Sequence, residues 1–388
     1  MRILALIDVL SFQPAGGAGT VLLEAGRALT RRGHELFVAC RRRTDLPLRG
    51  EVHDMHFLTY DAQPLLPWTF WTRGSATTVR AFEEARPDVV WAHHALPLLW
   101  IGGLRAPRVY TFHSPWHEEY LTRRSPAPGP IARWLANLRR RLEHSAVAAS
   151  NRVTVLSRAM GERLAEVHGR RDGVEVVPGG ADLERFVPPA DRYAVRARLG
   201  ADGETLLIAT VRSLIPRVGI EALLTAFGAV RRELPRAKLV VGGIGPLRLP
   251  LEKQVSRLGL DDSARFLGFV PDADLPGVLG AADLVVLPSQ ELEGFGLVAA
   301  EALACGTPVV ATPVGGLPEV LSPLDPTWIA DDRSAEAIAR AILRFASTAG
   351  PREALSARCR AFAEDRFSWD RVAVDLERVF DVARGKPL

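Results

Sequence analysis

Short apolar runs recur along this chain and alternate with segments of helical composition. Most of the runs are followed by a polar residue, a glycine or a proline, as expected for the buried strands of a parallel sheet. The alternation occurs in both halves of the chain and predicts two α/β units, each with a parallel sheet. The expected strands are 2–8, 35–40, 88–92, 108–112, 152–156, 174–177, 205–211, 239–241, 265–267, 283–287 and 309–311.

The pattern is clearest from Asp283 to Leu321, which reads strand, glycine loop, helix, strand, glycine loop, helix. Glycine suits the position after a helix, and proline cannot continue one, so Gly306 and Pro308 are expected to end the first helix. The six elements are 283–287, Glu293-Gly294-Phe295-Gly296, 297–304, 309–311, Gly315-Gly316 and 318–321.

Two carboxylates stand out in this segment. Glu293 lies in the glycine loop, and Glu301 lies inside the following helix. A helix that starts after Gly296 presents free backbone N–H groups and a positive dipole end, which suit a phosphate. Glu301 is two helical turns, roughly 12 Å, further along. A ligand with a diphosphate between two polar rings could span that distance.

The run EGFGLVAAEALACGTPVVAT resembles the signature of the retaining glycosyltransferases of family 4, in which seven residues separate two glutamates. The resemblance implies the GT-B fold, an α/β architecture of two Rossmann-like parallel-sheet domains that face a central cleft. It also implies that Glu301 holds the ribose of a nucleotide-sugar donor and that Glu293 is catalytic and holds the donor sugar. The backbone expected to bind phosphate and sugar oxygens is that of Gly294, Phe295, Gly296 and Leu297.

A second pair of glycines, Gly16 and Gly17, lies in the expected loop 11–19 before a helix at 20–32. This loop lacks the G-x-G-x-x-G fingerprint and the acidic residue of dinucleotide-binding folds. The resemblance implies instead a glycine loop near the donor diphosphate and the acceptor. A plain tight turn is the alternative.

Histidines follow two of the expected strands, His93-His94 after 88–92 and His113 after 108–112. Both groups therefore lie at the carboxyl ends of parallel strands, where such sheets bind ligands. The resemblance implies that His113, in the run HSPW, faces the donor sugar or the acceptor. These histidines, with His117, match no known metal-site spacing, so no metal is expected.

The chain departs from the family after the first strand of its second half. The family has Gly-Arg-Leu, three residues and Lys-Gly there, and its Arg and Lys hold the donor diphosphate. Ser213 and Val218 occupy those positions here, with Arg212 and Arg217 one residue away. We expect Arg217 to stabilise the leaving diphosphate and Arg212 to contribute less, because Arg212 directly follows a strand and can point away. Gly245 is a further candidate for donor binding.

A chain of 388 residues is too long for one ordinary core. The resemblance implies an acceptor-binding domain at 1–186 and a nucleotide-sugar-binding domain at 187–368. It also implies a C-terminal helix at 369–388 that packs back on the first domain. Pro188-Pro189 suits a linker of limited flexibility between the domains.

Composition narrows the possibilities further. Hydrophobic residues make up 47% and charged residues 24%, as in globular proteins, and no apolar run reaches the ~20 residues that span a bilayer. The start, MRILALIDVL, reads as a strand rather than a signal peptide, so a cytoplasmic location is expected. The three cysteines form neither a disulfide framework nor a metal-binding spacing. They are Cys40, Cys305 and Cys359.

One expected helix, residues 131–149, is strongly basic. Its leucines at 135, 138 and 142, with Val147, place one face in the core. A basic helix of this kind can lie on a membrane, but a solvated basic face is the favoured interpretation. Its arginines are Arg133, Arg139, Arg140 and Arg141.

We therefore expect a metal-independent, retaining glycosyltransferase without cofactors. It would move a sugar from a nucleoside diphosphate to a hydroxyl of a small-molecule, glycan or lipid-linked acceptor, with no nucleic-acid partner. Two alternatives remain open. A GT-B sugar-nucleotide epimerase would turn over the donor alone. A catalytically silent sugar-nucleotide-binding protein, which Ser213 and Val218 would suit, would neither hydrolyse nor transfer it.

Overall fold

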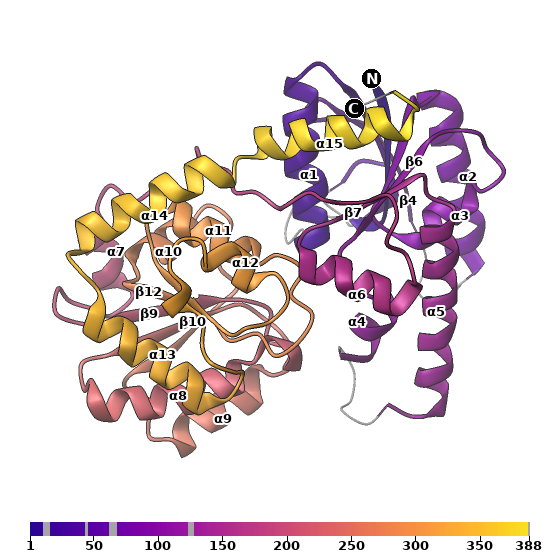
Figure 1. The fold of residues 1–388 in the computed structure, drawn as a ribbon. Coiled ribbons are helices and arrows are strands. Elements are labelled where there is room, and N and C mark those ends of the chain that lie inside the picture. The colour runs from indigo at the N-terminus through magenta and orange to yellow at the C-terminus, as the bar shows by residue number, and fades with distance from the viewer. Residues whose placement is uncertain (11–15, 43–45, 62–67, 123–127, 387–388) are drawn as a thin grey trace. The chain divides into compact units, whose positions relative to one another are not determined.

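The structure is a computed structural model that describes residues 1–10, 16–42, 46–61, 68–122 and 128–386. The chain forms two compact units, each built around its own sheet (Figure 1). Unit 1 comprises Met1–Gly179 and Trp369–Leu388, and unit 2 comprises Gly180–Ser368. The predicted α/β class with parallel sheets is confirmed in both units.

Unit 1 contains an eight-stranded sheet in the order β3-β4-β2-β1-β5-β6-β7-β8. Neighbouring strands are parallel except β3 and β4, which pair antiparallel at one edge. The strands are β1 (Arg2–Leu10), β2 (Glu35–Arg42), β3 (Arg49–Val52), β4 (Met55–Tyr60), β5 (Val89–Ala92), β6 (Arg108–Phe112), β7 (Arg152–Val155) and β8 (Val174–Val176). Its helices are α1 (Gly16–Arg31), α2 (Trp68–Ala85), α3 (Ala95–Trp100), α4 (Trp116–Thr122), α5 (Pro130–Ala148), α6 (Arg158–His168) and α15 (Trp369–Ala383).

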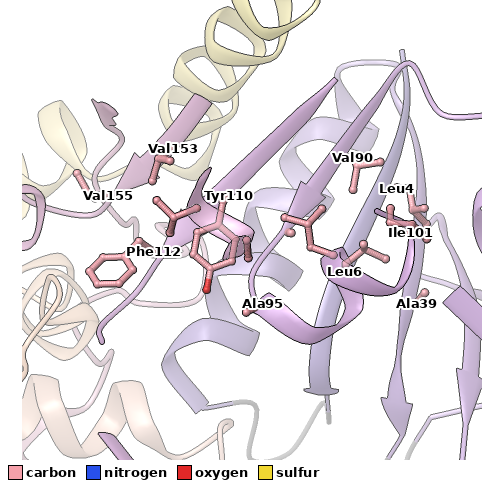
Figure 2. Close-up of a cluster of buried hydrophobic side chains, with 14 of the residues drawn as sticks. Leu4, Leu6, Ala39, Val90, Ala95, Ile101, Tyr110, Phe112, Val153 and Val155 are labelled. Atoms are coloured by element: carbon pink, nitrogen blue, oxygen red, sulfur yellow. The ribbon is translucent and has the colours of Figure 1, made fainter. Parts of the chain in front are cut away.

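Successive residues of these strands face helices on opposite sides of the sheet. Leu4 of β1 and Val90 of β5 belong to a buried apolar cluster that also contains residues of α2, α3 and α5 (Figure 2). Trp91, the next residue of β5, turns to the other face and meets Phe380 of α15 edge-on, with ring centroids 5.8 Å apart. Burial on both faces is why these strands are continuous apolar runs.

The last helix, α15, lies beside α1 in unit 1 (Figure 1). The guanidinium of Arg31 pairs with Asp370 at 3.0 Å, and that of Arg32 pairs with Glu377 at 2.7 Å. Together with the buried Phe380, these pairs attach the end of the chain to its beginning.

Unit 2 contains a five-stranded parallel sheet in the order β11-β10-β9-β12-β13. Helices α8, α9 and α13 cover one face, and α7, α10, α11 and α14 lie on the other (Figure 1). The strands are β9 (Leu207–Val211), β10 (Lys238–Gly242), β11 (Ala264–Gly268), β12 (Leu284–Leu287) and β13 (Val309–Ala311). The α-helices are α7 (Arg192–Arg198), α8 (Ile220–Glu233), α9 (Arg248–Arg257), α10 (Leu275–Ala281), α11 (Leu297–Ala304), α12 (Leu317–Leu321), α13 (Ala335–Thr348) and α14 (Arg352–Arg366), with 3-10 turns η1 (Pro216–Val218) and η2 (Pro326–Trp328).

The division between the units falls before Gly180 rather than after Phe186. Phe186 is fully buried in unit 2, and Arg360 of α14 donates hydrogen bonds to the carbonyls of Leu183 and Phe186. Pro189 packs against Gly280 of α10, so the proline pair belongs to the body of unit 2 instead of forming a free linker.

The predicted strands lie where the apolar runs placed them, with ends that differ by two residues or fewer. The expected loop 11–19 is wrong from Gly16 on, because α1 already begins at Gly16. Residues 11–15 of that loop lie outside the described ranges. The pair β3 and β4 was not predicted. β3 has the sequence RGEV and is almost wholly exposed, so it carries no apolar signal.

Candidate active site

The order of the strands in the sheet of unit 2 reverses between β9 and β12. From β9 the strand order runs through β10 and β11 on one side and through β12 and β13 on the other. Open α/β sheets bind ligands at the carboxyl ends of the two strands that flank such a switch point. Arg212 directly follows β9, and Ser289 and Glu293 follow β12, so all three residues come from the two loops at this point.

The side chains of these three residues form one hydrogen-bonded cluster. Arg212 Nη2 donates to Oε2 of Glu293 at 2.5 Å, and Ser289 Oγ donates to the same oxygen at 2.9 Å. Arg212 Nη1 also donates to Ser289 Oγ at 3.4 Å. Among the described residues, none donates a hydrogen bond to Oε1 of Glu293, so this oxygen is able to accept a ligand hydroxyl.

Glu293 is ionised at neutral pH although it is only 9% exposed. Burial by itself raises the pKa of the carboxyl group. The charge and hydrogen bond of Arg212, the hydroxyl of Ser289 and the charge of Arg217 outweigh burial, and the pKa lies below its ordinary value. The cluster therefore keeps a negative charge inside the protein at the switch point.

Two glycines hold the main chain of Glu293. Gly316 N–H donates to the Glu293 carbonyl at 3.0 Å. Gly315 has a φ of +55°, and a Cβ atom built on it would lie 1.8 Å from the same carbonyl oxygen. Any side chain at Gly315 would therefore displace Glu293.

Arg217 braces the loop that carries Glu293. Its Nη1 donates to the carbonyl of Leu292 at 3.0 Å, and its own carbonyl accepts from the N–H groups of Gln290 and Glu291. Leu292 has a φ of +53°, which is unfavourable for a leucine, so the brace stabilises a strained residue. The expectation that Arg212 points away is wrong, because its guanidinium reaches Glu293.

Glycines also fix the segment that follows β9. Cβ atoms at Gly243 and Gly245 would lie 1.8 Å from the carbonyl oxygen of Arg212 and 2.3 Å from that of Leu214. Gly245 thus has a packing role in placing the Arg212 segment, whatever its role toward a ligand. Ser213 is exposed, whereas Val218 is buried, so Val218 cannot present a polar group there.

Helix α11 begins after Gly296, which has a φ of +90° and caps the helix without a side-chain hydrogen bond. Ala299 N–H donates to the Gly296 carbonyl at 2.8 Å, whereas the N–H groups of Leu297 and Val298 have no partner within the helix and can bind a ligand. The ring of Phe295 packs edge-on against Phe367 and is 4% exposed, so only its main chain is a candidate for ligand contact. Glu301 lies on α11 and is 7% exposed.

In unit 1 the switch point lies between β1 and β5, and His93 directly follows β5. His93 Nδ1 and His113 Nε2 are 2.9 Å apart, with near-parallel rings whose centroids are 5.1 Å apart. Burial lowers the pKa of His113 to about 4, although the charge of Glu119 opposes the shift. Burial and His113 lower the pKa of His93 as well. Both rings are therefore neutral at pH 7, and one proton lies between them.

This pairing decides which atom His113 offers to a ligand. Nε2 is occupied by His93, so Nδ1 is the ring nitrogen that remains. Sequence reasoning missed His93 as a partner, because adjacency of the two strand ends follows from β5 lying beside β6. The neighbouring His94 has a different role, since its side chain accepts from Leu96 N–H and caps α3.

A buried carboxylate orients the segment after His113. Glu143 of α5 is 2% exposed and accepts from Trp116 N–H at 3.0 Å, which fixes the start of α4. The Tyr110 hydroxyl donates to it at 3.2 Å, and His168 Nε2 lies 3.1 Å from it. Burial and this carboxylate raise the pKa of Tyr110 well above its ordinary value.

The remaining sequence-based candidates in unit 1 are two glycines. Gly16 and Gly17 form the first turn of α1, and a Cβ atom built on either would meet nothing within 4 Å. Within the described ranges, no group of three or more His, Cys, Asp or Glu side chains could hold a metal ion.

Family models match most of the chain. The model for Glycosyltransferase Family 4 matches residues 15–185, and the model for Glycosyl transferases group 1 matches residues 191–362. A protein of Actinosynnema mirum named D-inositol 3-phosphate glycosyltransferase is 32% identical over an alignment of 397 positions. The alignment covers 95% of this chain and 93% of that protein. The chain belongs to glycosyltransferase family 4.

Other similarities agree with this membership. A protein of the same name from Saccharomonospora viridis is 39% identical over 253 residues, 61% of this chain and 57% of that protein, so the chain matches just over half of that relative. A sucrose-phosphate synthase from Thermosynechococcus elongatus superposes with a TM-score of 0.81 at 24% identity, over 98% of this chain and 99% of that one. The last similarity concerns the fold and confirms the GT-B class.

The contact of Gly315 and Gly316 with the Glu293 carbonyl, here called the clamp, predicts the effect of adding a methyl group at Gly315. Gly315→Ala should lower kcat/KM by about 100-fold, the scale expected when a catalytic group shifts by about 1 Å. Gly259→Ala is the matched control, because Gly259 has a φ of +66° but open space around it. Both variants should lose about 1–2 kcal/mol of stability from backbone strain. Equal activity in the two variants would contradict the clamp.

The histidine pair predicts acid sensitivity of unit 1. The folded protein binds fewer protons than the unfolded chain between pH 6.5 and pH 4, so the free energy of unfolding should fall as the pH falls through this window. His113 can contribute a slope of up to about 1.4 kcal/mol per pH unit. Urea unfolding at pH 7, 6 and 5 should show a smaller slope for His113→Gln than for the wild type. Equal slopes in the two proteins would contradict this expectation.

Proposed function

We propose that this glycosyltransferase moves a sugar from a nucleoside diphosphate to an acceptor hydroxyl with retention of the anomeric configuration. The observation that carries the proposal is the Arg212–Glu293–Ser289 cluster at the switch point of unit 2. Family membership supports transfer over the epimerase and over a silent binding protein.

The donor would bind along α11. The free N–H groups after Gly296 suit the diphosphate, and Glu301 would accept the ribose hydroxyls. Oε1 of Glu293 would accept hydroxyls of the transferred sugar, because Oε2 is already engaged by Arg212 and Ser289. Each charge-assisted hydrogen bond of this kind contributes about 1.5–3 kcal/mol.

Arg212 would supply the cation that Ser213 and Val218 do not. The bond between the anomeric carbon and the phosphate oxygen breaks during transfer, and negative charge grows on the leaving diphosphate. A guanidinium carries five N–H donors, and Arg212 uses two nitrogens on Glu293 and Ser289, so further donors remain for a phosphate. A fixed cation at this place lowers the barrier, because it costs no reorganisation during the reaction.

His113 would contact the donor sugar or the acceptor through Nδ1. A neutral imidazole can donate or accept one hydrogen bond without a charge, which suits recognition of a hydroxyl. The relatives named D-inositol 3-phosphate glycosyltransferase make inositol phosphates the first acceptors to assay, followed by other polyols and lipid-linked glycans.

The stereochemical outcome tests the reaction. A thermal-shift screen with UDP, GDP, ADP and dTDP should identify the base by the largest rise in Tm. The product formed from the matching α-linked donor should then be α-linked, as read from the anomeric proton coupling in NMR. A β-linked product would exclude retention. Consumption of the donor without an acceptor, with formation of an epimeric donor, would support the epimerase.

The different roles proposed for Arg212 and Arg217 predict different effects of their substitution. Arg212→Ala should lower kcat/KM at least ~100-fold, because it removes the charge beside the leaving group. Arg212 is also the main group that lowers the pKa of Glu293 against the effect of burial, so its loss should raise that pKa. The acid limb of the kcat/KM profile, which protonation of Glu293 sets, should therefore move to higher pH. Arg217→Ala should cost less than about tenfold in kcat/KM and about 1–2 kcal/mol in stability, since it removes a brace. The reverse ranking would assign the catalytic cation to Arg217.

A further inference from the structure

Asp8 lies near the carboxyl end of β1, at the switch point of unit 1 between β1 and β5. The register of β1 against β2 shifts between Leu6 and Val9, as in a β-bulge, and Asp8 lies inside this interval. Bulges re-aim side chains and are common next to active sites. His93 N–H donates to the Leu6 carbonyl at 2.7 Å, so β5 runs beside β1 up to the residue before His94. Asp8 therefore lies at the end of the sheet that also carries the histidines.

The carboxylate of Asp8 accepts no hydrogen bond from the described part of the chain. Its Oδ1 is buried, and its Oδ2 lies 3.6 Å from Nη2 of Arg41, which is longer than a hydrogen bond. The Asp8 side chain is 28% exposed, so a ligand can reach it. Buried carboxylate oxygens in proteins are nearly always hydrogen-bonded. An ionised carboxylate only accepts, so the partner that suits Asp8 is an O–H or N–H group.

Carboxylates also dominate the charge around the neighbouring histidines. Burial lowers the pKa of His94, and the charges of three carboxylates oppose this shift, while the charge of one guanidinium adds to it. The carboxylate of Glu119 acts in the same way on the pKa of His113, which burial lowers to about 4. The balance of charge here is negative and disfavours an anion. The four groups that act on His94 are Asp8, Glu143, Glu119 and Arg139.

We propose that Asp8 binds a hydroxyl group of the acceptor and selects an uncharged polyol over its phosphate ester. The hydroxyl donates to the carboxylate, and the neutral His113 can make a second hydrogen bond to the same polyol. A phosphate at this place would meet Asp8 and Glu119 as like charges, and such repulsion is a means by which sites reject a ligand. The inference rests on the proposed transfer reaction and narrows its acceptor to an unphosphorylated polyol or sugar.

A neighbouring carboxylate shows what a structural ion pair looks like at this end of the sheet. Asp61 follows β4, and its Oδ2 accepts from Nη2 of Arg42 at 3.0 Å. Asp8 does not approach Arg41 as closely. Asp61→Asn is therefore the matched control for Asp8→Asn, because it removes the same charge from a paired carboxylate.

Binding of two probes that differ by one phosphate tests the role of Asp8. The probes are myo-inositol and D-inositol 3-phosphate, titrated by ligand-observed NMR into the full chain with the nucleoside diphosphate that gives the largest rise in Tm. The wild type should bind myo-inositol about tenfold or more tightly than D-inositol 3-phosphate, the scale of one close like-charge contact.

Two substitutions separate the hydrogen bond from the charge. Asp8→Asn keeps an oxygen that accepts a hydroxyl, so its Kd for myo-inositol should stay within about threefold, while its Kd for D-inositol 3-phosphate should fall about tenfold or more. Asp8→Ala removes the oxygen as well, so its Kd for myo-inositol should rise about tenfold. Asp61→Asn should leave both Kd values unchanged.

Several results would overturn the role of Asp8. They are tighter binding of D-inositol 3-phosphate than of myo-inositol by the wild type, no binding of either probe, an unchanged ratio of the two Kd values in Asp8→Asn, and an equal change of that ratio in Asp61→Asn. Transfer assays distinguish this inference from the proposed function. Binding of myo-inositol through Asp8 without transfer from any donor would support the polyol site and reject the transfer reaction. Transfer to D-inositol 3-phosphate alone would do the reverse.

Discussion

The buried carboxylate of Glu293 is the group on which the candidate donor site depends. An unpaired charge in this position would cost more free energy than the loop around it could supply, so the fold must bring a cation to it. Arg212 fulfils this need, with Ser289 as a second donor. The close approaches of three loops make that contact possible. Gly243 and Gly245 lie against the Arg212 segment, Gly219 lies against the Pro288 carbonyl, and Gly315 lies against Glu293.

The corresponding cluster of unit 1 is a pair of histidines that carries no net charge. His93 and His113 form a hydrogen-bonded pair, and desolvation keeps both rings neutral. The carboxylate of Glu143 supports the neighbouring segment through Trp116 N–H, and its charge is compensated by hydrogen bonds from Tyr110 and from the main chain. Each unit thus places polar groups at the carboxyl ends of its strands, and hydrogen bonds to neighbouring side chains hold Glu293 and His113 in fixed orientations.

The two arginines after β9 contact different parts of the segment around Glu293, although they lie close together in the chain. Arg212 and Arg217 have the same chemistry and lie five positions apart in one loop. The 3-10 turn η1 directs Arg217 back toward the carbonyl of Leu292, while Arg212 leaves the end of β9 on the side of β12. Five positions in one loop therefore separate a side chain that reaches Glu293 from one that braces the loop of Glu293.

The sequence by itself determined the class of fold, the positions of nearly all parallel strands and the family, because buried parallel strands are continuous apolar runs and the two glutamates with their glycines keep a fixed spacing. It also placed His113, Glu293 and the start of α11 at strand ends. Only the tertiary structure decided which side chains meet. Arg212 contacts Glu293, and His93 contacts His113, because neighbouring strands bring together residues that are 81 and 20 positions apart. It also decided that Leu138 faces solvent, because helical periodicity identifies an apolar stripe without showing which stripe the sheet covers.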